Sequence, residues 1–158
     1  LPGLRTLEKY AVRMGGGHNH RMGLHDAILI KTNHLLAYSG QRIAYTNAIQ
    51  QMIQVAQQKA NGTFVEIEVR NVLEFKAALH AQPDAILLDN WPIGRIRRAV
   101  ALLNAARSTL HALPLLEVSG GITPRNVRAI ASTGVDRISI GRLTHSAPAL
   151  DVSLAILP

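Results

Sequence analysis

Five short apolar runs, each ending beside a polar residue or a glycine, constrain the fold of this chain more than any other feature. The runs predict strands at residues 27–30, 63–69, 85–88, 115–118 and 136–140. Segments with apolar residues at helical spacing stand before and between them, at residues 4–14, 41–60, 72–81, 93–111 and 123–132. Strands that alternate with helices, over connections long enough for right-handed crossovers, predict an α/β protein with a parallel sheet.

The residues at the strand ends favour one arrangement of that sheet. A barrel and a doubly wound sheet both accommodate the order of elements. A functional or small residue stands at the end of each predicted strand, namely Lys31, Glu68, Asp89, Ser119 and Gly141. A ring of such groups from successive strands is typical of a (β/α) barrel, so we expect a barrel with parallel strands.

Charge and composition narrow the class of partner. The 158 residues suit one domain, and 17 Lys and Arg against 10 Asp and Glu give a net charge of +7. This charge favours an anionic partner, which can be nucleic acid, a membrane surface or a phosphorylated or carboxylated small molecule. Aromatic residues, at 4%, offer few stacking platforms for single-stranded nucleic acid. The chain has no cysteine and no apolar run of membrane-spanning length, which suits a cytoplasmic protein.

The stretch GGGHNHRMGLHDAILIKTNH, residues 15–34, combines a glycine run with basic residues and a predicted strand. Three consecutive glycines permit a ligand or another strand to approach the backbone closely. His20, Arg21 and Lys31 are candidate anion ligands, with ordinary surface charge as the alternative. A metal site at His18 and His20, which would share a face of a strand, is disfavoured because no further ligands follow at metal spacing.

Two groups of carboxylates are candidates for chemistry. Glu66 and Glu68 alternate with apolar residues and lie on one face of their predicted strand, which is either a barrel interior or a solvated face. An interior carboxylate at the barrel mouth can stabilise a cationic transition state, hold ribose hydroxyls or bind Mg²⁺. Asp89 directly follows four apolar residues and is either a site residue or a turn former.

Two glycine-containing turns follow the last two strands. Ser119, Gly120 and Gly121 lead into a predicted helix with Thr123 as its N-cap, an arrangement that suits a phosphate but also an ordinary turn. The turn at Gly141 strengthens the first reading, because paired loops after the final two strands often bind phosphate in barrels.

Taken together, these segments resemble the quinolinate phosphoribosyltransferases, also called nicotinate-nucleotide pyrophosphorylases (carboxylating). The matching motifs run in the order of the family: PGLRTLEKYAV, GGGHNHRMGLHDAILIKTNH, VEIEV, ILLDN, SGGIT and GVDRISIGRLTHS. The resemblance implies a type II phosphoribosyltransferase barrel that uses Mg²⁺. It implies transfer of a phosphoribosyl group, a pentosyltransferase reaction of NAD biosynthesis. Quinolinate and phosphoribosyl pyrophosphate would give nicotinate mononucleotide, pyrophosphate and CO₂.

The resemblance also implies roles for individual residues. His20, Arg21 and Lys31 would bind the substrate anions. Glu68 and Asp89 would surround the ribose and its developing charge, and would bind Mg²⁺. Together with Lys31 they are the expected catalytic residues. Two groups of residues would bind the ribose phosphate. The first is Ser119, Gly120 and Gly121, and the second is Ile140, Gly141 and Arg142. His145 would lie beside them.

The chain departs from the family pattern at its N-terminus. The family has a Thr-Arg-Lys-Thr strand directly before the PGLR motif, preceded by a separate N-terminal domain, and here the sequence begins after both. Thr32 also stands where the family usually has Asp. We therefore expect residues 1–158 to be the C-terminal catalytic portion, an incomplete barrel with little activity alone. We expect a homodimer or higher homo-oligomer in the full-length form, with neither nucleic acid nor a membrane as partner.

Two alternatives remain open on the sequence. A paralogous group associated with molybdate-transport operons shares the same motifs and could act on a different base. From another class, a non-catalytic domain that binds anions or nucleic acid would also suit the charge of +7.

Overall fold

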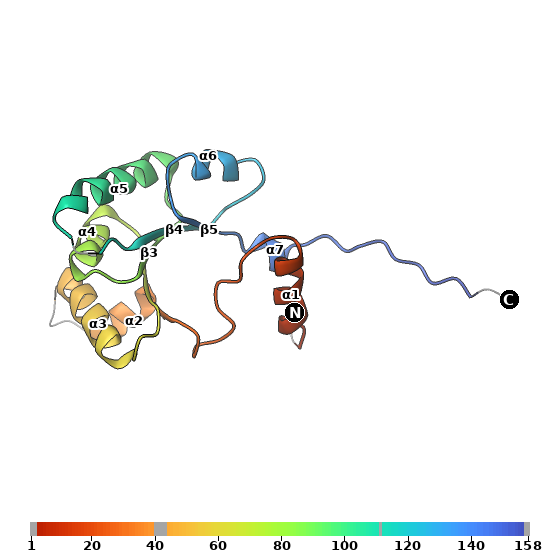
Figure 1. Cartoon of the computed structure of the whole chain (residues 1–158), viewed down its shortest axis with the longest axis horizontal. Helices are drawn as coiled ribbons and strands as arrows, with labels where there is room; N and C mark the ends of the chain where they lie inside the picture. The colour runs from red at the N-terminus through yellow and green to blue at the C-terminus, as the bar shows by residue number, and fades with distance from the viewer. Residues whose placement is uncertain (1–2, 40–43, 111, 157–158) are drawn as a thin grey trace.

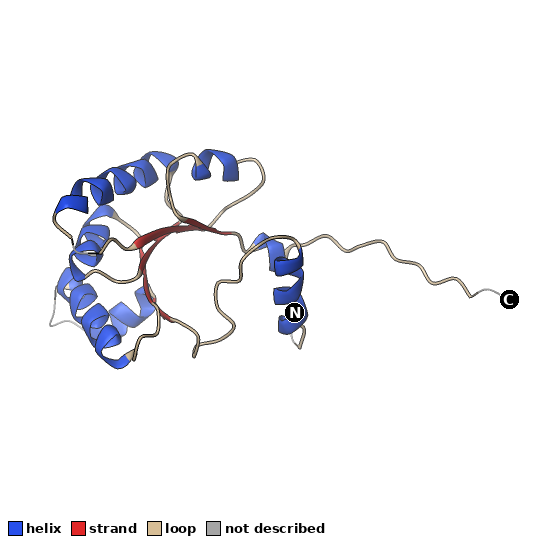
Figure 2. Cartoon of the chain, in the orientation of Figure 1, coloured by secondary structure: helices blue, strands red, loops and turns tan. Residues whose placement is uncertain are grey.

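A single sheet of five parallel strands forms the centre of the computed structural model, which describes residues 3–39, 44–110 and 112–156. The strands are β1 (Ile28–Ile30), β2 (Val65–Val69), β3 (Ala85–Asp89), β4 (Leu115–Ser119) and β5 (Arg137–Ser139). They pair in chain order, β1-β2-β3-β4-β5, and every pair is parallel. Figure 2 shows the sheet as an arc, with helices along its convex side. This confirms the predicted parallel α/β fold and all five predicted strands.

The helices that connect the strands run along the convex side (Figure 1). They are α2 (Thr32–Ser39), α3 (Tyr45–Lys59), α4 (Val72–Ala81), α5 (Ile93–Ala105) and α6 (Val127–Ala131), with a 3-10 turn η1 (Ala106–Ser108) after α5. Helix α1 (Arg5–Met14), before β1, and helix α7 (Arg142–His145), after β5, lie side by side at the open end of the arc. The sequence did not predict α2 or α7. The predicted helix over residues 93–111 was too long, because regular α-helix ends at Ala105. Residues 41–43 and 111, at the limits of two predicted helices, lie outside the described residues.

Alternation along the strands separates an apolar face from a polar face. Val65, Ile67 and Val69 of β2 are buried on the side that carries the helices. Glu66 and Glu68 therefore lie on the concave side, which confirms the interior reading of this face. The strand register places Glu117 of β4 on the same concave face, because Glu68 pairs with Leu87 of β3 and Leu87 pairs with Glu117.

The hydrophobic core fills the layer between the sheet and the helices. Ile86 and Leu116 from the strands, and Ile49, Phe75 and Ile96 from the helices, are all at most 1% exposed. Trp91, directly after β3, closes one end of this layer. Its ring meets Phe75 edge to face at 6.3 Å, and its Nε1 donates a hydrogen bond of 3.0 Å to the carbonyl of Val69. The indole thus ties the ends of β2 and β3 together, next to the ends of the strands that carry Glu68 and Asp89.

The glycine run at residues 15–17 ends helix α1. The N–H of Gly17 donates to the carbonyl of Val12 at 2.9 Å, and Gly16 has a φ of +81°, as in a Schellman cap. A Cβ on Gly17 would stand 2.9 Å from the side chain of Val12. These glycines therefore serve the end of their own helix, and Gly17 also lines the hollow beside the pocket, where the approach of a ligand stays a prediction.

The sheet is not closed into a full barrel. Within the described residues, β1 and β5 are edge strands with one neighbour each. The segment between α1 and β1 passes the open side of the arc (Figure 1). The structure is thus an incomplete barrel, as expected from the sequence. No helix in the described part of the chain is both long and apolar enough to cross a bilayer.

Removing a buried side chain of α4 should lower the free energy of unfolding far more than removing an exposed side chain of the same helix. Phe75 is fully buried in α4, whereas Leu73 is 72% exposed. We expect Phe75→Ala to lower the free energy of unfolding by about 3–5 kcal/mol. The control, Leu73→Ala, should change it by less than about 0.5 kcal/mol. Urea denaturation of both variants measures the difference, and equal effects would contradict the placement of Phe75.

Open edge strands should also make the chain associate. We expect light scattering to show an apparent mass that rises with protein concentration, because β1 and β5 present unpaired backbone groups. Exposed apolar side chains of the C-terminal segment, such as Leu150 and Leu154, are the competing cause. The double variant Leu150→Ser, Leu154→Ser should still associate. A monomer at all concentrations would contradict this prediction.

Candidate functional site

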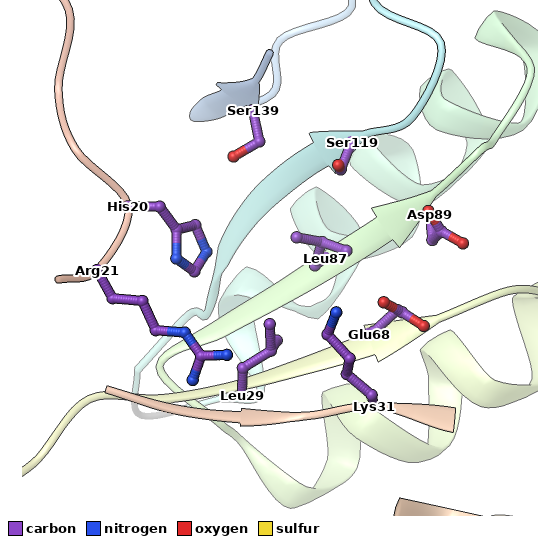
Figure 3. Close-up of a pocket in the computed structure, with 9 residues that line it drawn as sticks. All are labelled: His20, Arg21, Leu29, Lys31, Glu68, Leu87, Asp89, Ser119 and Ser139. Carbon is purple, nitrogen blue, oxygen red and sulfur yellow. The ribbon is translucent and has the colours of Figure 1, made fainter. Parts of the chain in front are cut away.

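The concave face of the sheet carries a polar pocket at the ends of the strands. Figure 3 shows its lining residues, which come from all five strand regions and from the segment before β1. They are His20, Arg21, Leu29, Lys31, Glu68, Leu87, Asp89, Ser119 and Ser139. The pocket thus brings together six of the residues predicted from sequence. An adjoining hollow shares His20, Ser119 and Ser139 with it and adds Ile140 and Gly141.

Two cationic side chains, those of Lys31 and Arg21, extend into the pocket from its open side. Lys31 follows β1 directly, and its side chain points into the pocket (Figure 3). Its ammonium group has no ion-pair partner within the part of the chain that the structure describes. Arg21 is held in place, because its Nη1 donates to the carbonyl of Ala27 at 3.1 Å and its own carbonyl accepts from Lys9 Nζ at 2.6 Å. The site therefore presents an unpaired ammonium beside a fixed guanidinium, a pair suited to an anion.

Two carboxylates, Glu68 and Asp89, lie on the strands across the pocket. Glu68 Oε1 accepts a hydrogen bond from Thr32 Oγ1 at 3.3 Å, so the residue that departs from the family pattern contacts the site directly. Asp89 Oδ1 accepts from the Asn90 side chain at 3.0 Å. Each of these bonds uses one carboxylate oxygen. Two hard oxygen donors on one pocket wall fit a Mg²⁺ ion, which prefers carboxylates and water.

A buried acidic pair stands behind the pocket and binds His20. Glu66 is 1% exposed and Glu117 is 2% exposed. His20 Nε2 lies 2.9 Å from Glu66 Oε2 and 3.5 Å from Glu117 Oε1. Ser139 Oγ donates a short hydrogen bond to Glu117 Oε1. The three ligand atoms of His20, Glu66 and Glu117 lie within 4.8 Å of one another, so His20 meets carboxylates and not a second imidazole.

Burial and charge shift the protonation of this cluster. The hydrogen bond that His20 donates to Glu66 raises the pKa of His20 above its ordinary value, although partial burial opposes it. Burial raises the pKa of the Glu117 carboxyl, against the hydrogen bond from Ser139. Sequence reasoning missed Glu117 and Ser139. The signal was present, since Glu117 interrupts an apolar strand and stands two residues before Ser119.

The turn after β4 requires glycine. Gly120 has a φ of +92°, and a Cβ there would stand 2.3 Å from Oδ1 of Asn90. The predicted side-chain cap at Thr123 is wrong. Instead, Asn126 Oδ1 accepts from the Thr123 N–H, its amide donates to the Gly121 carbonyl, and α6 begins only at Val127.

The turn after β5 lies at the same end of the sheet, because β4 and β5 are parallel. A Cβ on Gly141 would stand 3.0 Å from the ring of His145, so this histidine lies directly over the turn. Arg142 begins helix α7 beside it. The two predicted loops are therefore neighbours. Gly120, Gly121, Arg142 and His145 are not among the lining residues of the two hollows.

The raised pKa values predict a stability that falls as pH rises. Each of the two groups, His20 and Glu117, keeps its proton in the folded chain at pH values just above its own unfolded pKa, where the unfolded chain has released it. The contribution of His20 is fully present below its unfolded pKa, about 6.5, and is lost as pH rises through its folded value. Urea midpoints measured between about pH 6 and pH 8 should therefore decrease with pH.

Two variants separate the contribution of the His20 cluster to this pH dependence from the contributions of other titratable groups. Glu117→Gln should make the pH dependence shallower, because the amide neither titrates nor attracts a proton to His20. His80→Gln, which replaces an exposed histidine of α4, should leave the slope unchanged. A midpoint that increases with pH in the unmodified chain would contradict the assignment.

Comparison with known proteins places this chain in a family. A model of the quinolinate phosphoribosyl transferase C-terminal domain matches residues 1–155. A nicotinate-nucleotide pyrophosphorylase (carboxylating) of Mycobacterium leprae is 40% identical over 154 residues, which make up 98% of this chain and 50% of the relative. A probable enzyme of the same name from Bacillus subtilis is 41% identical over 155 residues, 98% of this chain and 49% of the relative.

Solved structures agree with the sequence comparison. The crystal structure of nicotinate-nucleotide pyrophosphorylase from Ehrlichia chaffeensis superposes with a TM-score of 0.77 at 41% identity, covering 92% of this chain and 48% of that one. The chain thus spans about half the length of the relatives it matches. Because one family model accounts for nearly the whole sequence and relatives agree with it in sequence and in fold, the chain belongs to the quinolinate phosphoribosyltransferase family and corresponds to its C-terminal domain.

Proposed function

We propose that this chain carries the catalytic pocket of a pentosyltransferase that joins phosphoribosyl pyrophosphate to quinolinate. The products would be nicotinate mononucleotide, pyrophosphate and CO₂, a step of NAD biosynthesis. The observation that carries the proposal is a concave pocket in which cationic side chains face carboxylates, beside two small-residue turns and an adjoining hollow. The printed names of the relatives, nicotinate-nucleotide pyrophosphorylase (carboxylating) and quinolinate phosphoribosyltransferase, support the same reaction.

Three cationic or polar groups suit the two anionic substrates. Quinolinate carries two carboxylates on adjacent ring positions, and pyrophosphate carries several negative charges. Arg21 can form two parallel hydrogen bonds to a carboxylate, whereas Lys31 acts as a point charge that can follow a moving group. His20 adds a ring nitrogen on the same side of the pocket. These side chains would hold the base in line with the ribose, which converts an encounter of two substrates into a step within one complex.

The carboxylates suit the charge that develops on the ribose. As the pyrophosphate leaves, the anomeric carbon becomes cationic, and fixed negative groups lower the energy of that state. Glu68 and Asp89 are the groups on the pocket wall that can do this or bind the ribose hydroxyls. Glu68 and Asp89 would also hold Mg²⁺, which when bound neutralises charge on the pyrophosphate.

The turns after β4 and β5 would bind the ribose phosphate. Ser119, Gly120 and Gly121 offer a hydroxyl and backbone N–H groups, and Ile140 and Gly141 face the adjoining hollow. Arg142 and His145 would add positive charge at the edge of this position. After transfer, loss of CO₂ leaves the electron pair of the broken bond on the ring carbon, where the adjacent pyridinium nitrogen stabilises it, and a proton from water then completes nicotinate mononucleotide.

A partner subunit would complete the site. In the described residues the sheet is open along β1 and β5, so a second subunit could cover the pocket there. We therefore propose a homodimer as the active form, with a small molecule as its ligand and neither nucleic acid nor a membrane as its partner. Polar residues concentrated in a concave pocket support a small-molecule ligand over a nucleic acid.

The first test is formation of nicotinate mononucleotide by the chain alone and by the chain completed with the N-terminal portion of the Bacillus subtilis relative. We expect the completed protein to turn over quinolinate and the chain alone to show little activity. Activity with another base but not with quinolinate would favour a paralogous specificity. Salt-dependent DNA binding that phosphoribosyl pyrophosphate leaves unchanged would contradict the enzymatic function.

Lys31 provides the sharpest single variant. In the completed protein, Lys31→Ala should lower kcat/KM by the value of a lost charged hydrogen bond, roughly 1.5–3 kcal/mol or about 10- to 150-fold. The matched control is Lys59→Ala, at the exposed C-terminal end of α3 and away from the pocket. Unchanged kinetics of Lys31→Ala would remove this residue from the site.

A further inference from the structure

The cluster of His20, Glu66 and Glu117 is not explained by the roles proposed so far. Both carboxylates are buried, and Glu66 Oε1 has no hydrogen-bond partner in the described structure. Buried carboxylates are costly unless hydrogen bonds or opposite charges compensate them. The side chain that provides the compensation, His20, belongs to the segment that crosses the open side of the sheet.

We propose that Glu66 and Glu117 are positioning residues that hold the His20 ring through its Nε2–H, so that its Nδ1–H is offered to an anionic substrate group. The proposal rests on the proposed function, in which the pocket binds anions. Glu66 and Glu117 themselves touch no substrate in this account. They act through the orientation and the proton content of one imidazole ring.

The distances determine which ring nitrogen carries a proton. Nε2 lies 2.9 Å from one carboxylate oxygen and 3.5 Å from another. An ionised carboxylate only accepts hydrogen bonds, so an unprotonated Nε2 would face these oxygens with its lone pair. The favourable arrangement has the proton on Nε2. Within the described residues Nδ1 has no hydrogen-bond partner, and the His20 side chain is 32% exposed at the pocket.

A second proton on the ring follows from the surrounding charges. A neutral ring with Nε2–H would leave a bare acceptor at Nδ1, which repels an anion. Two carboxylates beside the ring favour the doubly protonated, cationic form, in which Nδ1 also donates. The raised pKa of His20 agrees with this form.

The charged groups on the neighbouring elements support the assignment. The positive charge of Arg21, on the same segment, lowers the pKa of His20, whereas Glu66 on β2 and Glu117 on β4 raise it. On β5, Arg137 stacks on the ring of Phe64 at 5.0 Å, and Ser139 donates to Glu117. The remaining charged residues that line the pocket with His20 are Lys31, Glu68 and Asp89.

The test is NMR of the histidine ring nitrogens in the 158-residue chain. Ring ¹⁵N shifts report which nitrogens are protonated, and exposed His80 serves as an internal reference. We expect His20 to carry both ring protons at neutral pH. Addition of quinolinate, or separately of inorganic phosphate, should shift the Nδ1 resonance of His20 and leave His80 unchanged.

Carboxylate variants test the positioning role. Glu66→Gln should lower the pKa of His20 by about one unit and weaken quinolinate binding about tenfold at neutral pH, whereas Glu66→Asp, which keeps the charge, should recover part of both. Glu117→Gln should act in the same direction. The control Glu8→Gln changes a carboxylate of α1 outside the pocket and should change neither quantity.

Each outcome has a defined reading. His20 found neutral with a bare Nδ1 in the unmodified chain overturns the proposal, and this result needs no variant to fold. An unchanged pKa of His20 in both Glu66→Gln and Glu117→Gln also overturns it. Binding of Zn²⁺ to His20 Nε2 that is lost in either variant would overturn it as well. A His20 that responds to phosphate but not to quinolinate supports the positioning role and contradicts only the proposed substrate.

Discussion

Two buried carboxylates on the concave face of the sheet determine much of this architecture. Glu66 and Glu117 are almost completely shielded from water, where an uncompensated negative charge is costly. His20 compensates them, and it reaches them only because residues 17–27 cross the open side of the arc. That crossing in turn brings Arg21 to the pocket. The need to satisfy buried charge thus places two of the cationic residues that the proposed chemistry uses.

The helices and the strands contribute differently to the site. Helices α3 and α4 pack on strands β1 to β3 from the convex side and bury their apolar residues, so a one-residue shift of the register would expose them. Register then places side chains in rows: Asp89 pairs with Ser119, and Ser119 with Ser139, at the ends of three adjacent strands. Trp91 strengthens this end of the sheet, because its indole bonds to the Val69 carbonyl. The pocket is therefore built on rigid strand ends, and its cations come from segments beside them.

Sequence patterns predicted the strands well because each strand combines an apolar face with a distinct end. Lys31, Asp89 and Ser119 were identified from position alone, and Glu68 from alternation. Helix α2 was missed because it begins immediately after Lys31, where a strand and a helix meet without a loop. The helix cap at residues 15–17 was not predicted, because a Schellman cap and a ligand-binding turn share the same composition. The contacts of His20 with Glu66 and Glu117 join residues 46 and 97 positions apart, which local patterns cannot reveal.

The central claim is that the concave pocket binds the phosphoribosyl donor, with the phosphate between the turns after β4 and β5. A crystal structure of the chain soaked with phosphoribosyl pyrophosphate tests this most directly. We expect the 5-phosphate against Gly120 and Gly141, the ribose beside Glu68 and Asp89, and the pyrophosphate toward Lys31. Density for the ligand on the convex face or along the edge of β1, with the pocket free of ligand, would contradict it.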